Sequence, residues 1–412
     1  MVTVVDLINK DLHNSVRKIY IKRRNFDGTF ESNWLRIDRY KNVNTVENFG
    51  SISQEINWQP TTLDNFNVSG VSLKFQNKQG YFNSETAFGS IWYPETTYLN
   101  RINSKLKIEC GYLDSNGKEV GVVSVFEGII NSVRTTEKDT ALMTVLSYQN
   151  LLTLYNISDL SLTENQSAST IIDAIMNQSK ITDYMPFVAA TPDLDLDIDT
   201  SQLSGTYWDV IRRVAFLSNS VPLIVGDAFS FIPRVGGSVV FNFKGRGTEG
   251  SNDSIFNIVS YDDEGASRVR TYWKETTEDL IIETSRSILL KKYKSSPQSV
   301  SFSELTTTAD KNNLLLSLLR QWEAPKPTIV FNTKFMVNEI QPLDKITVQI
   351  ISGSNVGGDG TKWGDGSKWG DGSKWGARKG GINIMKGQEW FVTKVTKNID
   401  NWSTTITAEK IT

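Results

Sequence analysis

The chain has 412 residues, of which 39% are hydrophobic and 22% are charged, so it can bury two or three cores and is not disordered in bulk. Its 44 basic and 46 acidic residues leave a formal net charge of −2, which excludes a general cationic surface for nucleic acid. One cysteine, Cys110, and one histidine, His13, exclude an internal disulfide and a zinc site of the Cys/His type. We expect no catalytic site and no cofactor.

The N-terminal segment is acidic and polar where a signal peptide requires a basic start and an apolar run. No stretch approaches the roughly 20 apolar residues that a spanning helix needs. We therefore expect a protein made in a cytosol, without stable membrane insertion.

Residues 1–155 consist mainly of short runs rich in Val, Ile, Thr and aromatic residues, separated by Asn, Asp, Gly and Ser. The turn signal Ser115-Asn116-Gly117-Lys118 separates two such runs, as a hairpin requires. We predict a first β-barrel domain over this range.

The hydrophobic period then changes, and we predict a small α/β insert over 156–260. Helices are expected at about 167–178 and 206–218, the second opened by a capping box of Thr206 and Asp209. A β-hairpin with the turn Gly226-Asp227 follows.

Residues 261–412 return to strand patterns, with a leucine-rich helix at about 308–322, and predict a second β-barrel domain. The expected fold class is α+β, mainly β, with two tail-tube-like β-barrels flanking the insert.

Three segments, in this order, resemble the phage tail-hub family, whose members include the central baseplate hubs of contractile-tailed phages. Phe126-Glu127-Gly128-Ile129-Ile130 is similar to the end of the family's first barrel. The helix and hairpin over 206–231 are similar to its inserted unit. Ile340 to Val348 resembles the family pattern L-x-P-G-D-x-V-x-V, with Leu343 in place of the usual glycine.

The resemblance implies a homotrimer in which two barrels per chain make a pseudo-sixfold ring. Such a ring joins the sixfold tail tube to a threefold tip or spike and lines the path of DNA ejection. The implied partners are further copies of the chain, the tail-tube and tape-measure proteins, and tip, spike or fibre proteins, with DNA only in transit. The implied location is the virion tail, assembled in the bacterial cytoplasm.

The sequence GDGSKW, with Thr for Ser in the first copy, occurs three times within a predicted loop over 353–380. Each copy presents one lysine beside one tryptophan, which favours a contact arm that acts by cation–π and amphipathic contacts. The candidate contact residues are Lys362, Trp363, Lys368, Trp369, Lys374 and Trp375. The alternative is a flexible insertion without function. Calcium binding by Asp359, Asp365 and Asp371 fits no established spacing.

Asp193, Asp195, Asp197 and Asp199 alternate with apolar residues and would share one face of a strand. A cation site is one interpretation, and a solvated face over a packed one is the favoured interpretation. The alternative functions are a distal-tail or adhesion protein that binds host glycans, and a peptidoglycan hydrolase.

Overall fold

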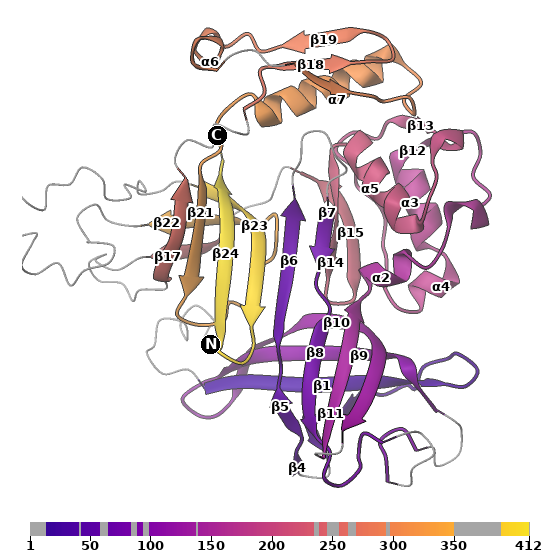
Figure 1. The fold of residues 1–412 in the computed structure, drawn as a ribbon, viewed down its shortest axis with the longest axis vertical. Coiled ribbons are helices and arrows are strands. Elements are labelled where there is room, and N and C mark those ends of the chain that lie inside the picture. Colours follow the sequence, from indigo (N-terminus) through magenta and orange to yellow (C-terminus); the bar gives the residue numbers. More distant parts are fainter. Residues whose placement is uncertain are drawn as a thin grey trace, which may run out of the picture.

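The computed structural model describes residues 14–40, 43–57, 65–83, 89–93, 99–136, 139–234, 239–244, 255–262, 269–293, 297–349 and 389–411. The fold is mainly β, with 48% strand and 18% helix. The chain forms two large sheets, a group of helices and a small α/β unit (Figure 1).

The N-terminal sheet has seven strands in the order β2-β1-β9-β10-β11-β8-β5, and all neighbours are antiparallel. A small pair, β3 (Arg39–Tyr40) and β4 (Val43–Asn44), lies outside this sheet. The strands of the sheet are β1 (Asn14–Asn25), β2 (Leu35–Arg36), β5 (Val46–Asn48), β8 (Val71–Gln76), β9 (Leu99–Leu113), β10 (Glu119–Thr136) and β11 (Thr140–Ser147).

The C-terminal sheet has eight strands, six of them in the order β16-β22-β23-β24-β21-β17. The other two, β6 (Ser51–Asn57) and β7 (Asn65–Val68), attach through β6 to the far half of β23. The six ordered strands are β16 (Val239–Lys244), β17 (Ile255–Asp262), β21 (Thr328–Thr333), β22 (Lys345–Gln349), β23 (Glu389–Asn398) and β24 (Ser403–Lys410).

The two sheets share one strand order. Without β2, each sheet has six strands in its main order, which can be numbered one to six by their place in the chain. Across both sheets the strands then lie side by side in the order one, four, five, six, three, two. They differ at one edge, where β1 is antiparallel to β9 but β16 is parallel to β22. The chain therefore contains the same arrangement of strands twice.

Both sheets are open in the part of the chain that the structure describes, because their edge strands do not pair with each other. The mainly β composition is as predicted, whereas closure into two barrels is not confirmed. The strands also cross the predicted boundary at residue 155, since β6 and β7 belong to the C-terminal sheet.

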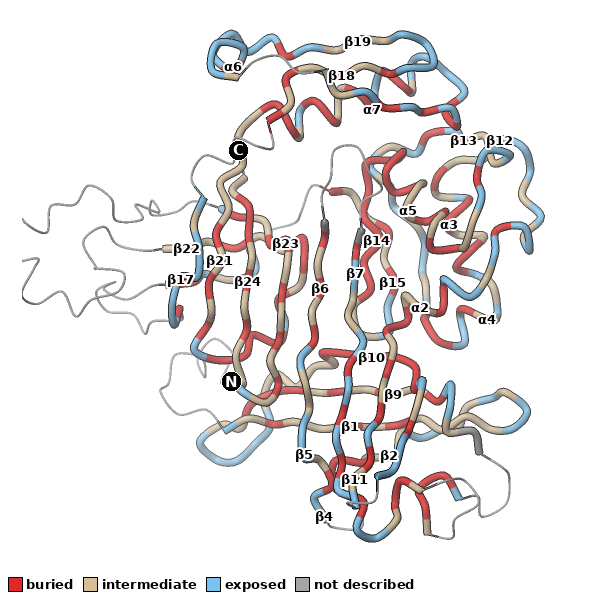
Figure 2. Tube along the Cα trace, viewed as in Figure 1, coloured by how far each residue is buried: buried red, intermediate tan, exposed pale blue. Residues whose placement is uncertain are grey.

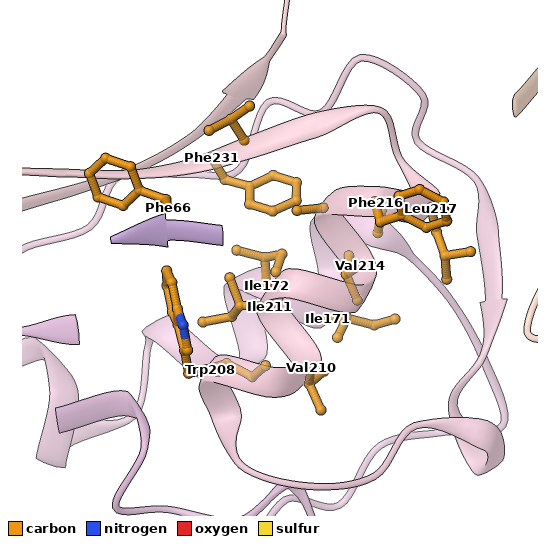
Figure 3. Packing of buried hydrophobic residues seen from close by; sticks show 14 of the residues in the cluster. Phe66, Ile171, Ile172, Trp208, Val210, Ile211, Val214, Phe216, Leu217 and Phe231 are labelled. Atoms are coloured by element: carbon orange, nitrogen blue, oxygen red, sulfur yellow. The ribbon is translucent and has the colours of Figure 1, made fainter. Parts of the chain in front are cut away.

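A group of short helices follows the N-terminal sheet, and its longest member begins at a capping box. Thr206 Oγ1 accepts the N–H of Asp209 at 3.2 Å, and the Asp209 carboxylate accepts the N–H of Thr206 at 3.0 Å. Trp208, Ile211 and Phe231 pack with Phe66 of β7 in one core (Figure 3). The elements are α2 (Gln149–Leu152), η1 (Ile157–Asp159), β12 (Asn165–Ser167), α3 (Ala168–Met176), α4 (Ser179–Thr182), β13 (Asp197–Asp199), η2 (Thr200–Gln202), α5 (Tyr207–Leu217), β14 (Ser220–Val225) and β15 (Ala228–Pro233).

Residues within the predicted second barrel form a separate small sheet, β19-β18-β20, which packs on α7 (Figure 1). Trp273 and Trp322 of this unit are buried in the same core as α3 and α5. The unit therefore extends the helical part of the molecule rather than the C-terminal sheet. Its elements are β18 (Tyr272–Glu275), β19 (Leu280–Glu283), α6 (Ser287–Lys292), β20 (Pro297–Val300) and α7 (Thr308–Trp322).

The two large sheets are joined by polar and apolar contacts. Asp400, in the β23–β24 turn, accepts the N–H groups of Phe49 and Gly50 at 2.9 and 3.1 Å. Met336 and Ile399 from the C-terminal half are buried in the core of the N-terminal sheet. These contacts hold the sheets at a fixed angle.

Candidate assembly surfaces

The six predicted contact residues, Lys362, Trp363, Lys368, Trp369, Lys374 and Trp375, lie outside the described residues. The strands on either side of them are described and are antiparallel neighbours, with Thr347 opposite Glu389. The repeats are therefore part of a long hairpin connection at one end of the C-terminal sheet. In the N-terminal sheet the equivalent connection is a tight turn, in which Asp114 accepts the N–H groups of Asn116 and Lys118 at 2.8 Å.

The edge strand β17 exposes two apolar side chains. Its pairing with β21 shifts register between Ile255 and Asn257 and again between Ile258 and Ser260. These two bulges leave Phe256 and Val259 unmatched, and they are 73% and 56% exposed. Figure 2 shows β17 as an exposed strand at the outer edge of the sheet. Exposed apolar residues on an edge strand are typical of surfaces that a partner covers.

A second exposed apolar group, which we call the α6 patch, consists of Ile288 and Leu290 on α6. These side chains are 76% and 37% exposed, and Lys291 and Lys292 occupy the last turn of this helix. The α6 patch lies at the tip of the small α/β unit (Figure 2). The sequence pattern reveals neither this patch nor the β17 edge, because exposure of an apolar residue depends on packing that periodicity does not show.

Three members of the predicted aspartate stripe bind local backbone or side-chain donors. Asp195 accepts the N–H and Oγ–H of Ser169 at the start of α3, both at 2.8 Å. Asp199 accepts the N–H of Ser201 at 3.0 Å, and Asp193 accepts the Asn219 amide at 2.6 Å. The described residues contain no cluster of three or more His, Cys, Asp or Glu residues that could hold a metal ion. Asp195 and Asp199 therefore bind the first turns of α3 and η2, and Asp193 binds the Asn219 side chain after α5.

Leu343 occupies the left-handed conformation that the family's glycine favours. Its φ is +75°, it follows Pro342, and the Asp344 N–H donates to the Gln341 carbonyl at 3.3 Å, which closes a turn. The Leu343 side chain is only 5% exposed and belongs to the largest core. The turn is thus kept with leucine, and burial of the side chain offsets the backbone strain.

The segment Phe126 to Ile130 is where the helical part meets the N-terminal sheet. A Cβ atom added at Gly128 would lie 2.2 Å from the Leu146 carbonyl oxygen, so only glycine permits this strand pairing. Glu127 is 7% exposed, and burial together with the Asp227 carboxylate raises its pKa to about 7. Asp227 belongs to the β14–β15 turn, so this carboxyl group lies where the insert contacts the sheet.

A partly buried ion pair joins the helices to the small α/β unit. Arg213 on α5 donates from Nε and Nη2 to the two carboxylate oxygens of Glu304, both at 2.6 Å. A third bond runs from Nη2 to the Ser301 carbonyl at 3.0 Å. The orientation of the small unit is therefore set by a bidentate contact.

Cys110 is fully buried, and burial raises the pKa of its thiol to about 12, which disfavours a nucleophilic thiolate. His13 lies outside the described residues. No described helix is both long enough and apolar enough to span a bilayer.

Comparison with solved structures shows similarity to phage tail proteins along almost the whole chain. A tail protein from Neisseria meningitidis gives a TM-score of 0.53 at 9% identity, covering 96% of both chains. A prophage tail protein from Listeria monocytogenes gives 0.51 at 10% identity, covering 95% of this chain and 94% of that one. The 43 kDa tail protein of prophage MuSo2 from Shewanella oneidensis gives 0.50 at 8% identity, covering 95% and 96%.

A scan against protein-family models and a search of curated protein sequences found no match. At 8–10% identity the structural similarity establishes the fold alone. The chain has the fold of these phage tail proteins, and the phage-tail part of the sequence resemblance is confirmed at that level.

Proposed function

We propose that the chain is a structural hub subunit of a bacteriophage or phage-like tail. Three copies form a ring with pseudo-sixfold symmetry, which joins the tail tube to the tip or spike and surrounds the path of the ejected DNA. The partners are further copies of the chain, the tube and tape-measure proteins, and tip or fibre proteins, all within the virion tail. The protein acts by assembly and catalyses no reaction on a substrate.

The observation that supports this proposal is the repeated strand order of the two large sheets. Three chains with two such sheets each would supply six similar units around a ring. Closed rings need heterologous contacts that return to their starting point, and a pair of similar units per chain lets threefold symmetry approximate sixfold. The similarity to tail proteins over 95–96% of the chain is consistent with this assignment.

The bulged edge of β17 is the proposed contact between neighbouring copies. Its exposed Phe256 and Val259 offer an apolar surface, and the bulges prevent simple edge-to-edge extension of the sheet into fibres. A neighbour that covers these side chains would stop growth at a closed ring.

The test is the mass and symmetry of the purified full-length protein, measured by light scattering and by averaging of negatively stained particles at high concentration. We expect a threefold ring. Replacing Phe256 and Val259 with lysine should lower its stability, whereas Val188→Lys, at a site 98% exposed on another surface, should not. A compact monomer that stays monomeric with purified tail components would contradict the hub assignment, and turnover of peptidoglycan would contradict the absence of chemistry.

The three GDGSKW-type repeats are the proposed contact arm toward another tail protein or the cell surface. Clustering three arms on one rim would strengthen weak contacts by multivalency. Deletion of residues 358–375 should leave the ring intact and reduce tail assembly or infectivity. Replacing Trp363, Trp369 and Trp375 with alanine tests the aromatic contribution separately. Full infectivity of the deletion variant would show that the repeats are dispensable.

A further inference from the structure

Lys397 on β23 is a buried lysine with a single hydrogen-bond acceptor among the described residues. Its Nζ atom donates to the Asn338 backbone carbonyl at 2.6 Å, and the residue is 5% exposed. No carboxylate in the described part of the chain lies within 4.0 Å of this nitrogen. Burial lowers the pKa of Lys397 to about 8, so roughly a tenth of the amine is neutral at pH 7. A desolvated neutral lysine is a nucleophile.

Asn338 places an unpartnered amide beside this amine. The residue is 5% exposed, and both Nδ2 and Oδ1 are buried without a hydrogen-bond partner in the described structure. A buried amide with neither atom satisfied is rare and costs free energy. Only Cα and Cβ separate the amide carbon, Cγ, from the backbone carbonyl that Lys397 contacts, so rotation about Cα–Cβ sets the distance between this amide and the amine.

The third residue of the proposed site is a partly buried acid, Asp344. Asp344 interacts electrostatically with Lys397, as does Glu339. Burial raises the pKa of Asp344 to about 6, although its Oδ2 accepts the Gln341 N–H at 2.9 Å. The Asp344 carboxylate lies more than 4.0 Å from Nζ, so it can take a proton from the amine and return it to a leaving nitrogen only through one bridging water.

We propose that Lys397 and Asn338 become joined by an intramolecular isopeptide bond. The Nζ lone pair attacks Cγ of Asn338, the new Nζ–Cγ bond forms and the Cγ–Nδ2 bond breaks. The Nδ2 nitrogen leaves as ammonia, and the proton that it gains comes from Nζ by way of a bridging water and Asp344. One amine and one primary amide become one secondary amide and ammonia, and no oxidant or cofactor is required.

The product removes both unfavourable features of the site. It replaces a desolvated amine and an unsatisfied primary amide with a neutral amide. It also links β23 covalently to the connection between β21 and β22, next to the contact of the two large sheets. Unfolding of the C-terminal sheet would then leave this loop closed, and a crosslink of this kind restricts the unfolded chain. The inference does not depend on the proposed function.

The test is the intact mass of the purified full-length protein. We expect a mass about 17 Da below that of the sequence, the mass of one ammonia, and a branched peptide containing Lys397 and Asn338 after proteolysis. Lys397→Met and Asn338→Ala should restore the unmodified mass, and Asp344→Asn should slow or prevent the loss. Lys394→Met changes a lysine of the same strand that pairs with Glu55 at 2.7 Å, and should keep the lower mass.

The wild-type measurement decides the matter even if a variant fails to fold. A wild-type mass equal to that of the sequence, with Lys397 and Asn338 recovered in separate linear peptides, overturns the proposal. A lower mass whose branched peptide maps to another lysine also overturns it.

Discussion

Replacing Glu127 with glutamine should make the protein more stable above neutral pH and leave its stability unchanged in acid. The Glu127 carboxyl is buried where the insert meets the N-terminal sheet, and its Oε1 accepts Ser124 Oγ–H at 3.2 Å. Glutamine has the same shape, can still accept this bond, and carries no charge. The substitution therefore removes the ionisable group with little change in packing.

The magnitude follows from the pKa of Glu127, which rises from 4.5 to about 7 on folding through burial first and the Asp227 carboxylate second. The pKa of Glu127 is higher in the folded state than in the unfolded state. The neutral carboxyl therefore contributes its full stability below the unfolded-state pKa, and this contribution is lost as the pH rises through the folded-state pKa. Each pKa unit corresponds to about 1.4 kcal/mol, so the ionised carboxylate lowers the free energy of unfolding by about 3 kcal/mol.

The assay is urea unfolding of both proteins at about pH 4.5 and about pH 8.5, where the linkage relation predicts the smallest and largest differences. Glu119→Gln is the control, since it alters an exposed carboxylate on the same strand that pairs with Lys18. Equal stability differences for Glu127→Gln at both pH values would refute the reasoning. So would a pH-dependent difference of the same size in the control.

Three further substitutions test packing by unfolding measurements. Gly128→Ala should cost about 1–3 kcal/mol, because the new methyl meets the Leu146 carbonyl and the strands must separate; an unchanged midpoint would contradict this. Leu343→Gly relieves roughly 1–2 kcal/mol of backbone strain but loses about 2–5 kcal/mol of buried side chain, so net destabilisation is expected and stabilisation would reverse the argument. Arg213→Met should cost about 3–5 kcal/mol by leaving Glu304 unpaired, and adding Glu304→Leu should recover most of the loss.

The helices and the hairpin of the insert could be predicted because their signals are local. The pair Thr206 and Asp209 begins a helix that the structure places at Tyr207–Leu217. The Gly226-Asp227 turn joins β14 and β15 as expected, with Gly226 at a φ of +60°. Turn chemistry and capping depend on residues within one or two turns of each other, so sequence alone contains the information.

The pairing of distant strands could not be predicted in this way. Alternation indicates that β6 has one buried face, but not that its partner is β23 rather than its neighbours in the chain. Alternation also does not determine whether the edge strands of a sheet meet, which is why closed barrels were expected where the described sheets are open. Alternation likewise does not show that β18, which contains Trp273, pairs with β19 and β20.

The candidate surfaces, too, could be predicted only in part from the sequence. Tryptophan and lysine in repeats are visible in sequence, and their role as a contact arm stays a prediction because they lie outside the described residues. The aspartate stripe allows two interpretations from the sequence. Only the hydrogen bonds of Asp193, Asp195 and Asp199 show that these carboxylates bind groups of the same fold. Exposure of Phe256 arises from a bulge, and Lys397 and Asn338 meet only through the fold.

The attachment of β6 to β23 has a consequence for synthesis of the chain on the ribosome. Glu55 pairs with Lys394, which lies 339 residues later. At about 5–20 residues per second, β6 is made roughly 20–70 s before its partner strand exists. During that interval the first sheet can form, while the β6–β7 hairpin has an unpaired edge. A chain released before residue 389 would keep that edge, so translational pausing between β7 and β23 should increase aggregation more than pausing before β6.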